Sequence, residues 1–205
     1  MDFARIFTIF EKEYPDARCS LNFKSSFELL IASRLSAQCT DEKVNMVTPI
    51  LFRKFPDALS MSRADVSEIE EIIKPCGLFR TKAKNLKNMC IHLVKDFNSK
   101  VPFGLENLQT LEGIGRKTAN LIISEVFHVP SIIVDTHVSR VSRRIGLHNE
   151  KDPFKIEMLL QQIIDESSWS SACHQMVFHG RKICKSRHSL CDNCCINKYC
   201  KRNFT

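Results

Sequence analysis

The segment Leu111-Glu-Gly-Ile-Gly-Arg-Lys-Thr-Ala-Asn120 decides the fold of this chain. Its two glycines permit a tight turn, because glycine adopts positive φ without steric cost and lets the backbone approach a ligand closely. The helix that we expect from Arg116 onward presents free amide groups and a partly positive dipole end, which bind phosphate well. The segment therefore predicts a phosphate-binding hairpin, in which the candidate contacts are Gly113, Gly115, Arg116 and Thr118. A plain corner between two helices is the alternative.

Lys117 is the second residue of this predicted helix and is a candidate nucleophile. An amine attacks only when it is unprotonated, and a helix N-terminus beside Arg116 favours the neutral form. A lysine at this position is more often a solvated charge or a phosphate contact, so the local sequence alone leaves both interpretations open.

The rest of the chain reads as all-α. Hydrophobic periodicity and capping residues predict an amphipathic N-terminal helix and further helices at 27–35, 40–55, 65–73, 80–97, 116–127, 136–145, 153–164 and 170–183. The only β-branched run, at 131–134, is four residues long and lies between two helices.

Four cysteines near the C-terminus are spaced C-x6-C-x2-C-x5-C, at Cys184, Cys191, Cys194 and Cys200. One loop of this length can wrap a single inorganic centre, an iron–sulfur cluster or zinc. Structural zinc sites usually pair two short Cys-x2–4-Cys units, and only Cys191 and Cys194 are spaced in that way. The six other cysteines, including the adjacent Cys195, are expected to be small buried hydrophobic residues.

Composition restricts the class of protein. The chain has 205 residues, is 43% hydrophobic and carries a net charge of +7, which suits a folded protein with an acidic partner. No apolar run approaches about 18 residues, and the N-terminus lacks a continuous apolar signal segment. Ten cysteines without a leader indicate a reducing compartment. We therefore expect a cytoplasmic protein, and the basic excess is compatible with either nucleic acid or an acidic membrane surface as a partner.

Taken together, five motifs resemble the endonuclease III family, the bifunctional DNA glycosylases and abasic-site lyases of the helix-hairpin-helix superfamily. They occur in the family's order and at its spacing: Leu35–Asp41, Gly77–Phe79, Leu111–Asn120, Val134–His137 and the cysteine motif. The resemblance implies a six-helix barrel domain (residues 20–130) that carries the helix-hairpin-helix. It also implies a helical domain (1–19 plus 131–205) with a [4Fe–4S] cluster loop at 184–200, and a cleft between the two domains.

The resemblance also implies roles for individual residues. Lys117 is the catalytic amine and Asp135 the essential carboxylate, although Asp135 followed by Thr136 is also a common helix cap. Gln38 and Leu78 match the residues that fill the gap and wedge the opposite strand; a helix-end polar residue and a core leucine are the alternatives. Further DNA contacts are expected from Gly113, Gly115, Arg116, Thr118, His137, Lys185 and Arg187, and cluster ligation from Cys184, Cys191, Cys194 and Cys200. Glu112 departs from the family, which usually has proline there.

These assignments predict excision of damaged, oxidised pyrimidines from double-stranded DNA through a lysine Schiff base, followed by strand cleavage by β-elimination. The resemblance implies double-stranded DNA with damaged bases or abasic sites as the partner, and no membrane. We expect a monomer that is associated with the nucleoid. One alternative is a monofunctional mismatch or adenine glycosylase, but such enzymes typically have serine or tyrosine at the position of Lys117. The other is a non-catalytic DNA-binding iron–sulfur protein, which needs the cysteines but neither Lys117 nor Asp135.

Overall fold

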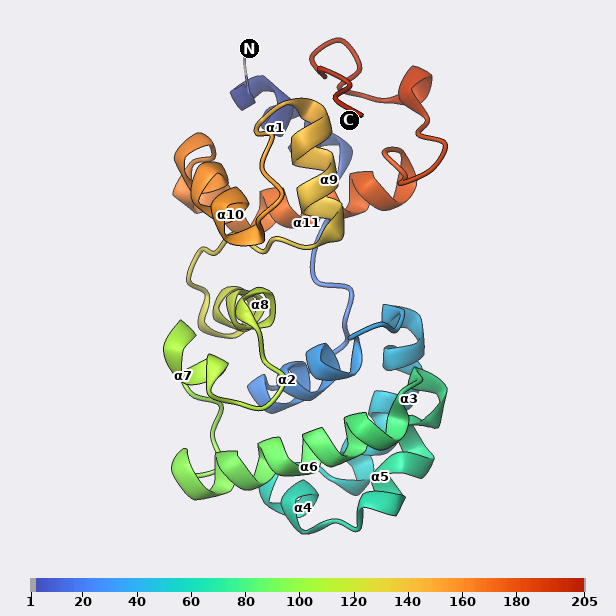
Figure 1. Cartoon of the computed structure of the whole chain (residues 1–205), viewed down its shortest axis with the longest axis vertical. Coiled ribbons are helices and arrows are strands. Elements are labelled where there is room, and N and C mark those ends of the chain that lie inside the picture. The colour runs from blue at the N-terminus through green and yellow to red at the C-terminus, as the bar shows by residue number, and fades with distance from the viewer. Residues whose placement is uncertain (1–2, 205) are drawn as a thin grey trace. The chain divides into compact units, whose positions relative to one another are not determined.

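A computed structural model describes residues 3–204 and contains helices, turns and loops over that range (Figure 1). No β-strand occurs among these residues, so the all-α prediction is confirmed. The α-helices are α1 (Phe3–Glu13), α2 (Ser26–Leu35), α3 (Asp41–Lys54), α4 (Ala58–Arg63), α5 (Val66–Ile73), α6 (Phe79–Asp96), α7 (Leu105–Gln109), α8 (Arg116–Phe127), α9 (Thr136–Ile145), α10 (Pro153–Ile163) and α11 (Trp169–Lys182). Short 3₁₀ turns are η1 (Lys74–Cys76), η2 (Glu166–Ser168) and η3 (Cys191–Asn193). Over the same residues, none of the helices has the length and apolar character needed to cross a membrane.

The helix starts follow the capping residues that the sequence supplies. Ser25 and Thr40 accept hydrogen bonds from the amides three residues later and so cap α2 and α3. Asp152 caps α10, in which Pro153 occupies the first turn, where its missing N–H costs nothing. The predicted and observed ends of these helices agree within one or two residues.

Two short helices were not predicted. The α4 helix begins at a capping box, in which Asp57 and Ser60 bond each other's backbone amides. The α7 helix has five residues, too few to show a helical period, and begins after Gly104 at φ 94°. It is the first helix of the helix-hairpin-helix, and it packs against α8.

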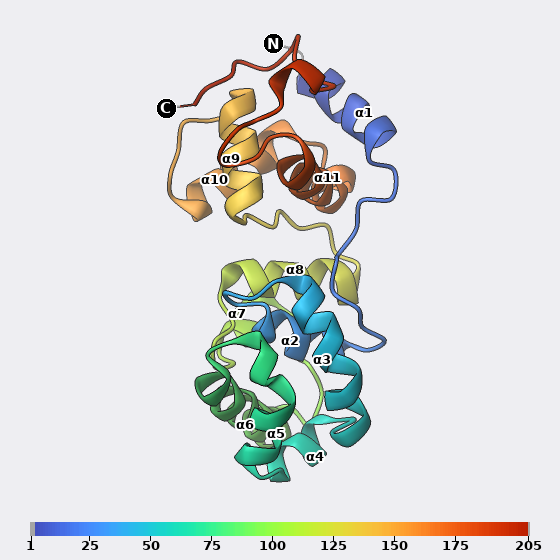
Figure 2. The same cartoon turned by 90° about the vertical axis from the view of Figure 1, so that its right-hand side faces the viewer.

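Contacts divide the described residues into two compact units, each built around its own core. The unit formed by residues 20–128 contains α2 to α8 (Figure 2). Here α6 packs against α4 and α5, and α2 packs against α3, α6 and α8. Leu30, Leu35, Leu51 and Leu86 are fully buried. Each such side chain contributes about 1.5–3 kcal/mol by leaving water.

The other unit combines residues 3–19 with 129–204, so the two ends of the chain fold together. Helix α11 packs against α9 and α1. Phe10 of α1 is fully buried and lies 4.9 Å, centroid to centroid, from the ring of His179 on α11. Ile132, Ile133 and Val134 enter the same core as a buried extended segment that precedes α9.

Candidate functional site

The glycine hairpin between α7 and α8 is anchored by its apolar residues and leaves its glycines exposed. Leu111 and Ile114 are buried, and the Ile114 amide donates to the Leu111 carbonyl at 3.1 Å. Gly113 has a φ of 78°, which disfavours any residue with a side chain. Gly115 is the N-cap of α8 and provides no side chain to bond the first amides. The exposed N-terminus of α8 is therefore suited to bind an anion.

Glu112, which replaces the expected proline, belongs to a polar network beneath the hairpin. The Asn85 amide, oriented to satisfy all its partners, donates to Glu112 Oε1 at 3.0 Å and accepts from the Arg34 guanidinium at 2.6 Å. The same guanidinium lies against Gly113, where an added Cβ would overlap it. Side chains from α2 and α6 thus support the hairpin at the point where proline would stiffen it.

Lys117 is exposed in the first turn of α8, directly after this hairpin. Its neighbours Arg116 and Thr118 are half-buried, and the opposite face of the helix is buried through Ala119 and Ile122. The Lys117 side chain is therefore accessible to solvent, while its backbone belongs to a helix that packs against the core.

Gln38 and Leu78 occupy two adjacent turns of the same unit, and both have left-handed backbones, with φ of 54° and 47°. Leu78 is 63% exposed, so its interpretation as a core leucine is wrong. Gln38 is exposed in the turn between α2 and α3. An exposed leucine held in a conformation that non-glycine residues seldom adopt is typical of a functional position.

Asp135 and His137 belong to the other unit, at the start of α9. Asp135 Oδ1 accepts from the amides of His137 and Val138, both at 2.8 Å, so the capping prediction is confirmed. The carboxylate is half-buried. The ring of His137 is also half-buried, and its Nδ1 lies 3.1 Å from the Arg140 guanidinium.

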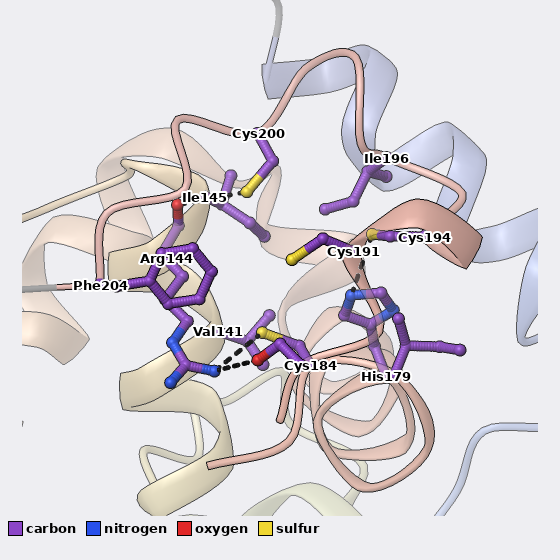
Figure 3. A pocket seen from close by; sticks show the side chains of 12 residues that line it. Val141, Arg144, Ile145, His179, Cys184, Cys191, Cys194, Ile196, Cys200 and Phe204 are labelled. Atoms are coloured by element: carbon purple, nitrogen blue, oxygen red, sulfur yellow. Dashed lines mark hydrogen bonds between the residues drawn. The ribbon is translucent and has the colours of Figure 1, made fainter. Parts of the chain in front are cut away.

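The four cysteines of the C-terminal motif line one pocket in this unit (Figure 3). The other lining residues are mainly apolar: Val141, Ile145, Ile183, Ile196 and Phe204. Within residues 3–204, no three histidine, cysteine or acidic side chains converge closely enough to bind a single metal ion.

Polar side chains reach two of these sulfurs, and the Arg202 amide donates to a third, Cys200 Sγ, at 3.4 Å. Arg144 donates from Nη1 to Cys184 Sγ at 3.5 Å, and the His179 Nε2 lies 3.6 Å from Cys194 Sγ (Figure 3). The buried Tyr14 hydroxyl lies 2.9 Å from His179 Nδ1. A neutral His179 that accepts from Tyr14 and donates to Cys194 satisfies both contacts. Burial, with nearby Cys195 and Glu13, raises the pKa of Tyr14 and keeps its hydroxyl a donor.

Arg144 also fixes the loop that follows Cys184. Its guanidinium donates to the carbonyls of Lys185 at 2.6 Å and Ser186 at 3.1 Å. The side chains of Lys185 and Arg187 are exposed on this loop. Local sequence gave no sign of Arg144, because an arginine on an amphipathic helix is ordinary and its partners lie about 40 residues away.

The predicted site residues thus fall into two groups. Residues 20–128 contain Gln38, Leu78 and the hairpin with Lys117, whereas Asp135, His137, the cysteines and the basic loop belong to the other unit. Sequence reasoning missed five residues that contact the hairpin or the cysteines and hold them in place: Asn85, Arg34, Arg144, His179 and Tyr14.

Comparisons with known proteins agree with this arrangement. Residues 31–166 match the family model described as HhH-GPD superfamily base excision DNA repair protein. Endonuclease III of Synechocystis is 43% identical over 95% of this chain and 90% of its own length, and that of Bacillus subtilis is 39% identical over 92% and 86%.

Among solved structures, a non-covalent endonuclease III–DNA complex superposes with a TM-score of 0.93 at 39% identity, covering 99% of this chain and 96% of that one. A trapped endonuclease III–DNA covalent intermediate gives 0.92 at 39% identity, covering 99% and 97%. The chain belongs to the HhH-GPD superfamily of base excision DNA repair proteins and, within it, to the endonuclease III family.

Proposed function

We propose that this base excision repair DNA glycosylase is bifunctional, with Lys117 as its nucleophile and Asp135 as its essential carboxylate. Its substrates are damaged bases, above all oxidised pyrimidines, and abasic sites in double-stranded DNA. The observation that carries the proposal is the placement of Lys117, exposed in the first turn of α8 beside an uncapped glycine hairpin. A 39% identical endonuclease III was captured as a covalent intermediate with DNA, which supports an attacking side chain here.

The chemistry assigned to Lys117 is covalent catalysis. The neutral amine attacks C1′ of the damaged nucleotide, the bond from C1′ to the base breaks, and the base leaves with a proton. Ring opening gives an imine between Lys117 and the sugar. The imine makes the 2′ proton acidic, so its removal expels the 3′ phosphate and cuts the strand. Splitting one difficult step into several easier ones is the general advantage of a covalent intermediate.

Asp135 assists the first step by accepting a proton from the amine or by stabilising the positive charge that develops on the sugar. It makes both backbone hydrogen bonds through Oδ1. Those bonds hold the carboxylate at the start of α9, and a carboxylate oxygen with several lone pairs can cap a helix and still accept a proton.

DNA is bound through the hairpin amides and basic side chains. The reacting nucleotide must leave the stack, at a cost of a few kcal/mol. Gln38 and Leu78 compensate by occupying the gap and wedging the opposite strand, as apolar side chains do in other DNA-bending proteins. The contacts with phosphate come from Gly113, Gly115, Arg116, Thr118, His137, Lys185 and Arg187.

The donor set in the cysteine pocket fits a [4Fe–4S] cluster held by Cys184, Cys191, Cys194 and Cys200. A single zinc ion requires four ligands within about 2.3 Å of one point, whereas a cluster binds each thiolate to a different iron atom. Sulfurs distributed around an apolar pocket, with N–H donors from Arg144 and His179, support the cluster. Its role is structural: it holds the loop that presents Lys185 and Arg187.

We further assign residues 20–130 to the barrel domain and residues 1–19 with 131–205 to the cluster domain, in a monomeric, cytoplasmic protein that works on the nucleoid. The boundaries at 19/20 and 128/129 between the compact units support this division.

Borohydride trapping tests the proposal. Wild type and Lys117→Gln, both loaded with iron, are incubated with a duplex containing one oxidised pyrimidine and then reduced. We expect a covalent adduct from wild type only, while Lys117→Gln still binds the duplex. Base release without an adduct from wild type would indicate a monofunctional glycosylase, and neither product would indicate a non-catalytic DNA-binding protein.

A further inference from the structure

Two cysteines outside the cluster motif meet in the unit formed by residues 20–128. Cys39 ends the turn that contains Gln38, and Cys76 ends η1, two residues before Leu78. Cys76 Sγ lies 4.0 Å from the carbonyl oxygen of Lys43, in the first turn of α3, the helix that follows Cys39. Both line one open pocket of about 310 Å³, together with Gln38, Thr40, Lys43, Pro75 and Gly77.

The two thiols differ in their access to solvent. Cys39 is half-buried, whereas Cys76 is 2% exposed. Burial, followed by the neighbouring Cys39, raises the pKa of Cys76 to about 11, so this sulfur stays a thiol at neutral pH. Cys39 is therefore the sulfur that a small reagent in the pocket meets first.

A buried cation supports the pair. Lys82 Nζ donates to the carbonyls of Leu35 at 2.9 Å and Cys76 at 2.8 Å, and the side chain is 3% exposed. Burial lowers the pKa of Lys82, while the charges of Cys39 and Cys76 oppose that shift, so the cation lies within electrostatic reach of both sulfurs. The Lys82 ammonium also links the end of α2 to η1 through these two carbonyls.

We propose that Cys39 and Cys76 form a redox-sensitive thiol pair, which hydrogen peroxide converts to a disulfide between the turn of Gln38 and the turn of Leu78. The Cys39 thiolate attacks one peroxide oxygen and the O–O bond breaks, giving a sulfenic acid on Cys39. The departing hydroxide takes up the proton that Cys39 released on ionising and becomes water. The Cys76 sulfur then attacks Cys39 Sγ, the S–O bond breaks, and the hydroxide leaves as water with the Cys76 proton. Two thiols lose two electrons, and one peroxide becomes two waters. A dithiol reductant reverses the change.

The consequence for DNA binding rests on the proposed function of Gln38 and Leu78. A disulfide holds two Cα atoms 4.4–6.8 Å apart and fixes the S–S torsion, so it removes freedom from both turns. Gln38 directly precedes Cys39, and Gly77 and Leu78 directly follow Cys76, and all three have positive φ. A disulfide at these positions therefore restricts the two turns that position the proposed gap-filling and wedging side chains. We therefore expect oxidation to lower the affinity for a duplex with an abasic-site analogue by at least about fivefold.

The test compares iron-loaded wild type, Cys39→Ser and Cys76→Ala after brief peroxide treatment. Peptide mass spectrometry is expected to find a Cys39–Cys76 linked peptide, 2 Da lighter than the two free thiols, in wild type only. DNA affinity is then measured before oxidation, after oxidation and after dithiothreitol. We expect the DNA affinity of wild type to fall on oxidation and to recover with dithiothreitol, and the affinity of Cys39→Ser to stay unchanged. Cys39→Ser controls for damage to the cluster, because its cluster is exposed to the same peroxide.

Absence of the linked peptide from oxidised wild type overturns the proposal, as does a disulfide that leaves affinity unchanged. An equal fall in Cys39→Ser also overturns it, because the damage then lies at the cluster. Failure of reduced wild type to bind the duplex contradicts the proposed function instead, since disulfide formation is measured without DNA.

Discussion

Asp135 combines two roles at the scale of a single residue, and substitution can separate them. Its Oδ1 caps α9 through two amides, and its charge is assigned to catalysis. Asparagine caps a helix about as well as aspartate but carries no charge, whereas alanine neither caps the helix nor carries a charge. The pair Asp135→Asn and Asp135→Ala therefore distinguishes stability from chemistry.

We expect Asp135→Asn to keep the free energy of unfolding within about 0.5 kcal/mol of wild type, and Asp135→Ala to lose about 1 kcal/mol. Both variants are expected to lose strand cleavage. Urea unfolding and cleavage of an abasic-site duplex measure the two effects. Wild-type cleavage by Asp135→Asn would leave capping as the only role of this residue.

At the scale of elements, the hairpin depends on two glycines with different requirements. Gly113 has positive φ and lies against the Arg34 guanidinium, whereas Gly115 has a φ of −89° and open space around its missing Cβ. A side chain at Gly113 is thus strained and crowded, while one at Gly115 is not.

We expect Gly113→Ala to lower the free energy of unfolding by about 1–3 kcal/mol and Gly115→Ala to change it little. Gly115→Ala is still expected to weaken DNA binding, because its methyl group stands where a phosphate approaches the first amides of α8. Thermal unfolding and fluorescence anisotropy with duplex DNA provide the two measurements. Equal loss of stability in both variants would contradict this account of the hairpin.

The turn after α9 contains a buried histidine whose charge state affects stability. His148 accepts from the Glu150 amide through Nδ1 at 3.1 Å and contacts Ser142 Oγ through Nε2 at 2.7 Å. Ser142 Oγ in turn donates to the Val138 carbonyl, so a neutral ring with hydrogen on Nε2 satisfies the network. Burial is the main cause that lowers the pKa of His148 below 6.5.

Because this pKa is lower in the folded state, the unfolded chain binds more protons as the pH falls below about 6.5. The contribution of His148 to stability is therefore complete above that pH and is lost as the pH falls through the folded pKa. We expect unfolding by urea to show this loss in wild type and a shallower pH dependence in His148→Gln. Parallel curves would rule out His148 as the cause, since both proteins share every other titrating group.

At the scale of the whole molecule, DNA binding is expected to depend on charge. The chain carries a net charge of +7, and each phosphate contact releases counterions, so affinity should fall steeply between about 50 and 200 mM salt. Lys185→Gln and Arg187→Gln are each expected to reduce the slope of log K against log salt by about 1. Lys54→Gln is the matched control, because Lys54 already pairs with Glu68 at 2.8 Å. A slope that Lys54→Gln reduces equally would mean that only net charge matters.

The sequence by itself determined the helical elements, because their signals are local. The period of the apolar residues, the caps at Ser25, Thr40 and Asp135, and the hairpin glycines all act within a few residues. The α7 helix was missed because five residues show no period.

Only the tertiary structure decided which distant side chains meet. It exposed Leu78 in a left-handed turn and placed the Asn85 amide against Glu112. It also directed Arg144 to Cys184 and placed Cys39 and Cys76 in the lining of one pocket. Each of these outcomes depends on how packed helices orient side chains that are 27 to 40 residues apart or on a backbone conformation that local propensity disfavours. Short-range patterns carry no information about such pairings, since they arise from the burial of the whole core.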